Sequence, residues 1–419
     1  MPGMQKRRGS AGLHYSADAA DRGLVRASFP LQASTSDLAG TSVRRIDTLD
    51  SVRGLAAITV VLDHILANPI FTATQGGSVI AIALAYSPLH IFWAGAQAVL
   101  LFFVLSGFVL ALPFLSPSPP SYRAFAVRRV CRIYLPYVFA LGVAVVAQRL
   151  VFVGPIIDRS AWAIWHTPIT LNAAVGYLLM TGLPEHQNFN PVVWSLVHEM
   201  RISLVFPILF VITTKLPLIW RCAIFVTLSG ACGLAATVIS PPRDEFISAV
   251  AHSFLRTGYY VWLFILGIEL ARYRYQIISW LAATRPWMKA ALFAIAICLF
   301  CIEWLSPVLH YHDELGDFAV GVGAGLFIVL ALGSARAFLT GHVPIFLGRI
   351  SYSVYLLHVI VMETLLYALY DHVSLALILG LILPASILVG YLAYWAVETP
   401  SIELGQQLST LIRRQTRSI

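Results

Sequence analysis

Long apolar segments dominate this sequence and restrict what it can fold into. About 20 consecutive apolar residues span the hydrocarbon core of a bilayer as a helix. Of the 419 residues, 58% are hydrophobic and only 11% are charged, whereas soluble domains carry about a quarter charged residues. We therefore predict an all-α, polytopic integral membrane protein with about ten transmembrane helices. The predicted spans are 49–70, 91–115, 133–153, 192–214, 221–239, 246–271, 288–306, 316–335, 346–369 and 374–396.

The basic residues predict the topology of these spans, because Lys and Arg concentrate in cytosolic loops. With the N-terminus in the cytosol, the predicted outer loops contain few basic residues, chiefly Arg159 and Arg243. Both termini are therefore expected to be cytosolic. The net charge of +8 reflects this topology and does not indicate nucleic-acid binding. We divide the chain into a disordered N-terminal tail at 1–45, a transmembrane domain at 46–400 and a basic C-terminal tail at 401–419.

Arg53 and His64 share one face of the first predicted helix. They are eleven residues apart in the run LDSVRGLAAITVVLDH, so their directions differ by about 20° and their positions by about 16 Å along the axis. Charged and polar groups are costly in hydrocarbon and normally face a bundle interior or a watery cavity. This pattern indicates a site that reaches into the membrane.

Glu199 is predicted to lie at about the same depth as His64. His64 is about 22 Å from the cytosolic end of its helix, and Glu199 is about 25 Å from the cytosolic end of a helix running the other way. A carboxylate that holds one imidazole nitrogen leaves the other free to accept a proton. The alternative is a polar pair that only joins two helices. His198 and Arg201 flank Glu199 on other helix faces, where packing or cavity roles are expected.

Two further groups of residues are typical of binding sites. Arg129 and Arg132 share one face of a helix start at the cytosolic surface and suit phosphate groups, although a topology signal with lipid headgroup contacts is the simpler interpretation. His358 lies about 14 Å into its helix with Tyr355 one turn before it. Its role is equally consistent with substrate contact and with helix packing.

Metal binding is not expected. The predicted outer stretch SPVLHYHDELGD resembles a set of metal ligands, but such loops are usually only solvated. The cysteines are scattered, and those within apolar runs behave as small hydrophobic residues. The short apolar segment 171–183 is predicted to be a re-entrant or interfacial piece on the outer side.

Several motifs together resemble the family-3 membrane acyltransferases over roughly residues 46–400. They are Arg53…His64, FFVLSGFVL at 102–110, Arg129…Arg132 followed by IYLPY, Trp194-Ser195-Leu196…Glu199 ending at Pro207, LGRISYSVYLLH ending at His358, and Glu398-Thr-Pro. Each is weak alone, but their order along the chain makes the resemblance strong.

The resemblance implies transfer of an acyl group, commonly acetyl from acetyl-CoA, to a hydroxyl of an extracytoplasmic or exported carbohydrate. It implies that His64 is essential and that Arg53, Arg129 and Arg132 serve function or acyl-CoA binding. We expect His64 to act as a general base oriented by Glu199, with a covalent acyl-histidine relay as the alternative. Ser195, Tyr355 and His358 are expected to contact substrate.

The expected location is the bacterial inner membrane, and acyl-CoA, the acceptor and the bilayer are the expected partners. Two alternatives remain. Intramembrane Arg, His and Glu residues could instead line the path of a transporter or flippase. The acceptor could instead be a small molecule such as a macrolide, or a lipid.

Overall fold

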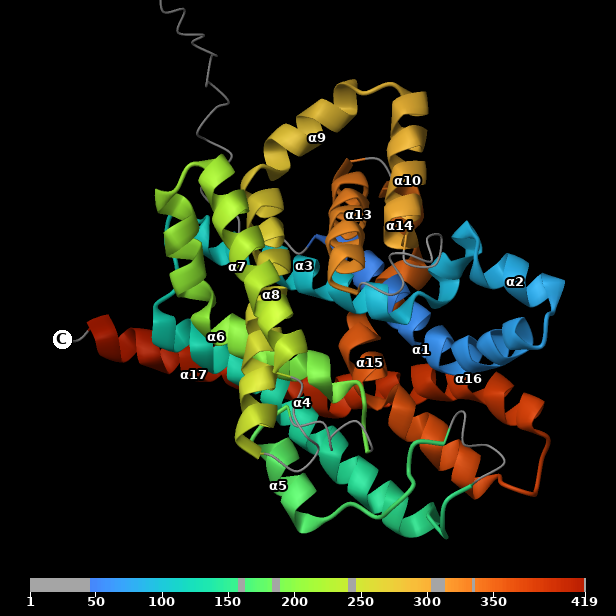
Figure 1. Cartoon of the computed structure of the whole chain (residues 1–419). Helices are drawn as coiled ribbons and strands as arrows, with labels where there is room; N and C mark the ends of the chain where they lie inside the picture. The colour runs from blue at the N-terminus through green and yellow to red at the C-terminus, as the bar shows by residue number, and fades with distance from the viewer. Residues whose placement is uncertain are drawn as a thin grey trace, which may run out of the picture. The chain divides into compact units, whose positions relative to one another are not determined.

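The computed structural model describes residues 46–156, 163–182, 189–239, 246–302, 313–333 and 336–417, and the regular elements in these ranges are helices (Figure 1). They are α1 (Asp47–Gln75), α2 (Val79–Ala85), η2 (Pro88–Trp93), α3 (Gly95–Phe114), α4 (Tyr122–Val151), α5 (Leu171–Leu178), α6 (Val193–Lys215), α7 (Leu218–Val238), α8 (Phe246–Arg272), α9 (Arg274–Ala283), α10 (Pro286–Phe300), α13 (Asp313–Gly333), α14 (Arg336–Leu339), α15 (His342–Ala368), α16 (Leu375–Ala393), η4 (Tyr394–Glu398) and α17 (Thr399–Arg417).

The predicted all-α, polytopic membrane class is confirmed. Eight helices in the described ranges are long and apolar enough to cross a membrane, and α1 makes a ninth when its two parts, bent by 41° near Pro69, count as one span. The remaining predicted span, 288–306, corresponds to α10, which has 15 residues and is shorter than a typical span. The short segment after residue 170 forms only the eight-residue helix α5. The orientation of the termini stays a prediction.

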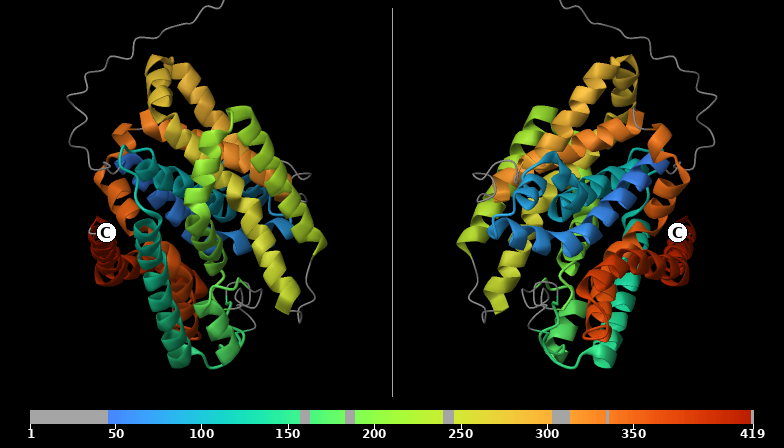
Figure 2. Two further views of the ribbon diagram at one scale, coloured as in Figure 1. Left: turned by 90° about the vertical axis from the view of Figure 1, so that its left-hand side faces the viewer. Right: turned by 90° about the vertical axis from the view of Figure 1, so that its right-hand side faces the viewer.

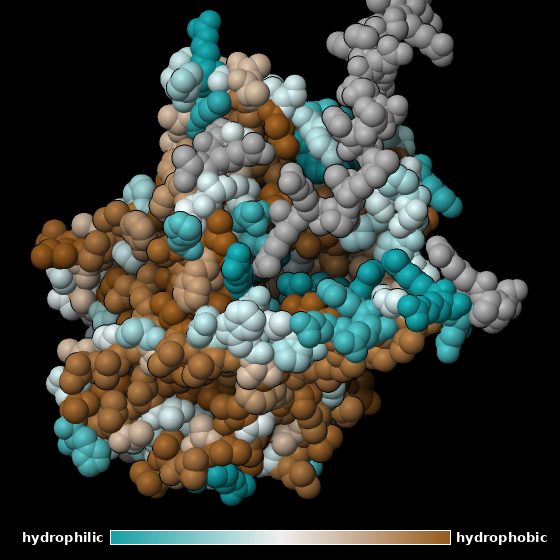
Figure 3. Space-filling view, turned by 180° about the vertical axis from the view of Figure 1, so that it is seen from behind, coloured by the Kyte–Doolittle hydropathy of each residue, from teal (hydrophilic) through white to brown (hydrophobic). Residues whose placement is uncertain are grey.

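Hydrophobic side chains cover much of the face of the molecule drawn in Figure 3. Large apolar side chains that are more than half exposed include Leu150, Ile208, Ile219 and Leu388. A soluble protein rarely exposes apolar side chains in such number, because each one costs free energy in water. These surfaces suit contact with lipid.

A glycine pair brings α1 and α15 into close contact. A Cβ atom on Gly54 would collide with the backbone of Gly348, and one on Gly348 would collide with the backbone of Asp50. Small residues at such crossings let two membrane helices approach until their backbones touch. Helix α1 packs against α15 more extensively than against any other helix (Figure 1). This contact sets the register of the two helices that carry His64 and His358.

The C-terminal helix α17 extends the last predicted span. Leu375–Gln415 is one helical run of 41 residues, interrupted only by the π-helical turn η4. At 1.5 Å per residue it is about 60 Å long, twice the thickness of the hydrocarbon core. Helix α17 packs beside α4, where Gly405 contacts the backbone of Arg128 (Figure 2). The predicted basic tail is therefore helical as far as Arg417.

Candidate active site

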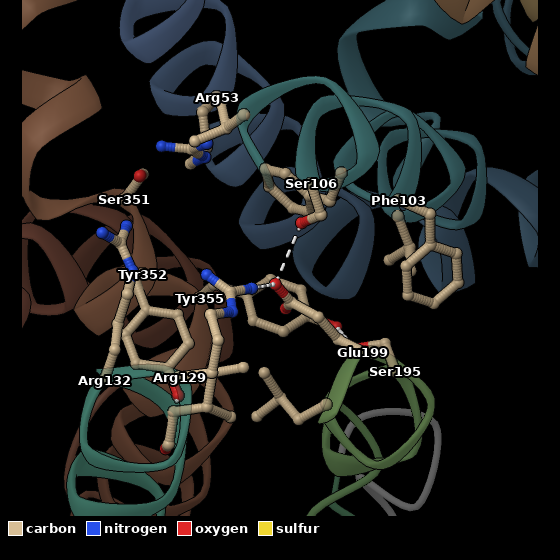
Figure 4. A pocket seen from close by; sticks show the side chains of 15 residues that line it. Arg53, Phe103, Ser106, Arg129, Arg132, Ser195, Glu199, Ser351, Tyr352 and Tyr355 are labelled. Carbon is tan, nitrogen blue, oxygen red and sulfur yellow. Dashed lines mark hydrogen bonds and ion pairs between the residues drawn. The ribbon is translucent and has the colours of Figure 1, made fainter. Parts of the chain in front are cut away.

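One pocket inside the bundle collects six of the eight predicted site residues. It measures about 710 Å³, including the space at its mouth, and α1, α3, α4, α6 and α15 line it (Figure 4). The six predicted residues in its wall are Arg53, Arg129, Arg132, Ser195, Glu199 and Tyr355. They come from segments as far as 302 residues apart in the sequence (Arg53 to Tyr355), so only the packing of the helices brings them together.

An ion pair between Arg129 and Glu199 lies at the centre of this pocket. Arg129 donates to Glu199 Oε1 at 3.0 Å and to the Ser203 hydroxyl at 3.2 Å, and the Ser106 hydroxyl donates to the same carboxylate oxygen at 2.9 Å (Figure 4). The side chains of Arg129 and Glu199 are only 12% and 19% exposed. A buried guanidinium needs such a counter-charge, since desolvating an unpaired charge is costly.

Positive charge exceeds negative charge on the pocket wall. Arg132 forms no hydrogen bond or ion pair with any residue that the structure describes, and the Arg129 Nε atom is buried without a partner there. Arg53 donates to Asp50 at 2.9 Å, one turn earlier on α1. Guanidinium groups with spare donors suit phosphate or carboxylate ligands. The wall can therefore accept an anionic ligand.

Aromatic and hydroxyl groups form another part of the pocket wall. Ser195 Oγ and Tyr355 Oη are 2.6 Å apart, and both hydroxyls lie within hydrogen-bond distance of the Val192 carbonyl oxygen. The Tyr355 ring meets Phe102 edge to face, with ring centroids 5.5 Å apart. Tyr355 and Ser195 are each 5% exposed. The hydrogen bonds hold the phenol ring in one position in the pocket wall.

The two predicted histidines lie side by side, next to Tyr355 and outside the set of residues that line the pocket. The imidazole centroids of His64 and His358 are 5.1 Å apart, and the centroids of His358 and Tyr355 are 6.0 Å apart. His358 is 1% exposed. Tyr355 therefore contacts the pocket on one side and the histidine pair on the other.

The predicted contact between His64 and Glu199 is wrong. Glu199 is bound by Arg129 and Ser106 instead, and the neighbour of His64 is His358. Matching depths along two helix axes say nothing of lateral position in the bundle, and a buried guanidinium competes for a carboxylate better than a neutral imidazole does.

The predicted start of the helix that carries Arg129 and Arg132 also needs correction. The sequence placed them at a helix start at the cytosolic surface, with the span beginning at residue 133. Helix α4 instead begins at Tyr122, where the Ser121 hydroxyl accepts from the Ala124 N–H. Both arginines therefore lie two to three turns inside the helix, and their side chains line the pocket.

Sequence reasoning gave no role to Ser106, Ser203 or Tyr352. Ser106 and Ser203 bind the Arg129–Glu199 pair, and the Tyr352 hydroxyl donates to the Ile133 carbonyl at 2.9 Å while its ring lines the pocket. Ser203 lies four residues after Glu199 and Tyr352 three before Tyr355, so each shares a helix face with a predicted residue. That spacing was the signal available for both.

No group of three or more His, Cys, Asp or Glu residues in the described ranges is arranged to hold a metal ion. His310 and His312 of the metal-like stretch lie outside the described residues. Asp317, at its end, accepts a hydrogen bond from Tyr259 at 2.9 Å.

Comparison of the sequence with known proteins identifies the family of this chain. Residues 46–395 match the model of a family described as an acyltransferase domain, and the chain belongs to this family. It is 26% identical over 388 residues to a Streptomyces mycarofaciens protein named acyltransferase MdmB, covering 86% of this chain and 93% of that relative. No solved structure matches the chain. The resemblance found in the sequence motifs is thus confirmed, and the chain is a membrane acyltransferase.

Proposed function

We propose that this acyltransferase transfers an acyl group, acetyl in the simplest case, from cytosolic acyl-CoA to a hydroxyl of an extracytoplasmic or exported carbohydrate. The expected location is a bacterial inner membrane. The observation that carries the proposal is the pocket in which Arg53, Arg129 and Arg132 converge beside the His64–His358 pair. Coenzyme A presents several phosphate charges and a long neutral arm that ends in the thioester, and the pocket offers cationic groups followed by an apolar, aromatic wall.

The phosphates of the donor bind the arginines in this proposal. Arg132 and the spare donors of Arg129 provide planar guanidinium groups for phosphate oxygens. Glu199 and Ser203 accept from Arg129 and hold it in place, which reduces the conformational entropy that the guanidinium loses when ligand binds. Glu199 thus acts through Arg129 and not through His64.

His64 is the general base in this proposal. Its imidazole accepts the proton of the acceptor hydroxyl while the hydroxyl oxygen attacks the thioester carbon, and the proton then passes to the departing thiolate. Because the histidine pair lies beyond Tyr355, the thioester has to reach past this ring. Ser195 and Tyr355 both line the pocket beside the histidine pair, and their hydroxyls are hydrogen-bonded to each other. They are therefore the proposed contacts to substrate.

Acyl transfer by purified protein in liposomes tests the proposal. Radiolabelled acetyl-CoA is supplied together with the surface glycans of the host, and wild type is compared with His64→Ala and with His372→Ala, an exposed histidine after α15. We expect label on glycan with wild type and His372→Ala, and a loss of at least about 100-fold with His64→Ala.

The other outcomes discriminate between alternatives. If label appears on an added lipid or small hydroxylated molecule, but not on glycan, the acceptor is not a carbohydrate, while acetyl-CoA remains the donor. Equal transfer by wild type and His64→Ala would remove His64 from the reaction.

A further inference from the structure

The tautomer of His358 is fixed by its surroundings. Its Nδ1 atom lies 2.7 Å from the Tyr355 carbonyl oxygen and 3.3 Å from the Val354 carbonyl oxygen. Carbonyl oxygens only accept hydrogen bonds, so Nδ1 carries the hydrogen. In a neutral imidazole the other nitrogen, Nε2, then has a free lone pair. His358 therefore offers an acceptor at Nε2.

This acceptor is buried without a partner. His358 is 1% exposed, and its Nε2 atom forms no hydrogen bond with any described residue. Buried polar atoms are almost always paired, because an unpaired one has lost its hydrogen bond to water and gained nothing. Such an exception at a candidate active site points to a donor that arrives during function.

His64 is positioned to be that donor. The two ring centroids are 5.1 Å apart and the ring planes are inclined by 52°. Two imidazoles joined by one N–H···N hydrogen bond of ordinary length have centroids about 5 Å apart. The distance between the two rings therefore matches that of a hydrogen-bonded imidazole pair.

The register of the helices maintains this distance. Gly54 contacts Gly348 where α1 crosses α15. His64 and His358 each follow their glycine by ten residues, on helices that run in the same direction from the contact. Equal steps of about 15 Å along both helices bring the two imidazoles to the same level.

The buried or half-buried carboxylates of these helices are bound to other groups. Asp63 accepts from the Gly95 N–H at the start of α3, where no residue caps the helix through its own side chain. Glu199 is bound by Arg129 and Ser106. Glu363, on the same helix as His358, accepts from the backbone N–H groups of Ile164 and Trp165. The usual partner of a catalytic imidazole is thus committed elsewhere in each case.

We propose that His358 is the positioning residue of His64, an inference that rests on the proposed function. Nε2 of His358 accepts the N–H of His64, which leaves the other nitrogen of His64 as the base. That nitrogen takes the proton of the acceptor hydroxyl as the new C–O bond forms. The C–S bond then breaks, and the thiolate receives the same proton from His64. His358 keeps its own proton throughout and stabilises the transient imidazolium of His64 through the N–H···N bond.

The test compares His358→Leu with His358→Gln in the liposome assay. Leucine removes the acceptor, and we expect kcat to fall about 100-fold while KM for acetyl-CoA stays within twofold. The glutamine side chain restores an acceptor oxygen and should recover kcat about tenfold over the leucine variant. His198→Leu is the matched control, since it removes another buried imidazole, bonded to Thr257 on α8, and should keep wild-type kcat.

Two results would overturn the inference. One is an active wild type with His358→Leu within twofold of its kcat. The other is a glutamine variant no better than leucine although both are folded. An inactive wild type would count against the proposed function instead.

A second measurement does not depend on turnover. Nitrogen NMR of wild-type protein labelled at histidine should show His358 with hydrogen on Nδ1 and His64 in a single tautomer. In His358→Leu, His64 should become a mixture of tautomers. An unchanged His64 spectrum in that variant would contradict the positioning role even if its activity were low.

Discussion

Two arginine sites in the same helical bundle differ in how completely their donors are used. Arg201 on α6 donates to the Ser253 and Thr257 hydroxyls and to the carbonyl oxygens of Met180 and Thr181. Its guanidinium also stacks over Phe254 at 4.1 Å. Both terminal nitrogens of this guanidinium have partners, so Arg201 fastens α6 to α8 and to the segment that follows α5.

Two arginines of the pocket, Arg129 and Arg132, leave donors unused. One terminal nitrogen of Arg129 donates to both Glu199 and Ser203, but its Nε atom has no partner among the described residues. The guanidinium of Arg132 has no partner there either. An unpaired buried donor lowers stability in the free protein and becomes useful when a ligand supplies the acceptor. The comparison therefore separates arginines that hold the fold from arginines that await an anion.

The largest effect is expected at Arg201. In Arg201→Leu, three carbonyl groups, those of Ser253, Met180 and Thr181, and two hydroxyls lose a charged donor, and the free energy of unfolding should fall by about 3 kcal/mol. Thermal unfolding in detergent measures it, with Arg132→Leu as the control that should unfold near the wild-type temperature. Equal destabilisation by both substitutions would abolish the distinction between the two sites.

The next effect is expected at Arg129. Arg129→Met removes a phosphate donor and leaves Glu199 with only the Ser106 hydroxyl, so acyl transfer should fall about 100-fold, or about 2.7 kcal/mol. The double variant Arg129→Met/Glu199→Gln should be more stable than Arg129→Met alone, because the amide needs no counter-charge. Strictly additive effects on unfolding would show that the two side chains are not paired.

The helices and the pocket residues could be predicted largely from the sequence, for physical reasons. Each predicted span overlaps a helix of the described ranges, because the bilayer demands a minimum apolar length, which can be counted. Arg53 and Glu199 stand out because polar groups in apolar runs must face an interior, whereas Arg129 and Arg132 stand out as a guanidinium pair that suits phosphate groups. Their convergence in one pocket depends on the packing of the helices.

The partners within the site could not be predicted in the same way. Depth along a helix is readable from the sequence, but the choice of Arg129 over His64 as the partner of Glu199 depends on the lateral packing of α4 against α6. A signal for the histidine pair was nevertheless present. Gly54 precedes His64, and Gly348 precedes His358, by the same ten residues. This equal spacing becomes informative only when it is known that the two glycines are in contact.

A smaller effect is expected at Arg132, whose side chain supports no other residue. Arg132→Leu should raise KM for acetyl-CoA about tenfold, leave kcat near wild type and leave the unfolding temperature unchanged. The increase should shrink at high salt, since screening weakens the wild-type contact as well. Arg149→Leu, an exposed arginine at the other end of α4, is the matched control. If kcat falls instead of KM rising, Arg132 contacts the reacting atoms and not the donor's phosphates.

The smallest effect is expected at Ser106, which tests whether Glu199 must be held from two sides. Ser106→Ala removes the hydroxyl that donates to Oε1 at 2.9 Å but keeps the ion pair with Arg129. One hydrogen bond to a charged group is lost and the pocket remains open to water, so kcat/KM should fall only about threefold, or about 0.7 kcal/mol.

Combined with Arg129→Met, the same substitution should have a larger effect on stability, because Glu199 then has no donor left. Steady-state kinetics and thermal unfolding of the two single variants and the double variant measure this coupling. A Ser106→Ala loss as large as that of Arg129→Met would mean that the serine, and not the ion pair, fixes the carboxylate, and the pocket would then be organised from α3 instead of α4.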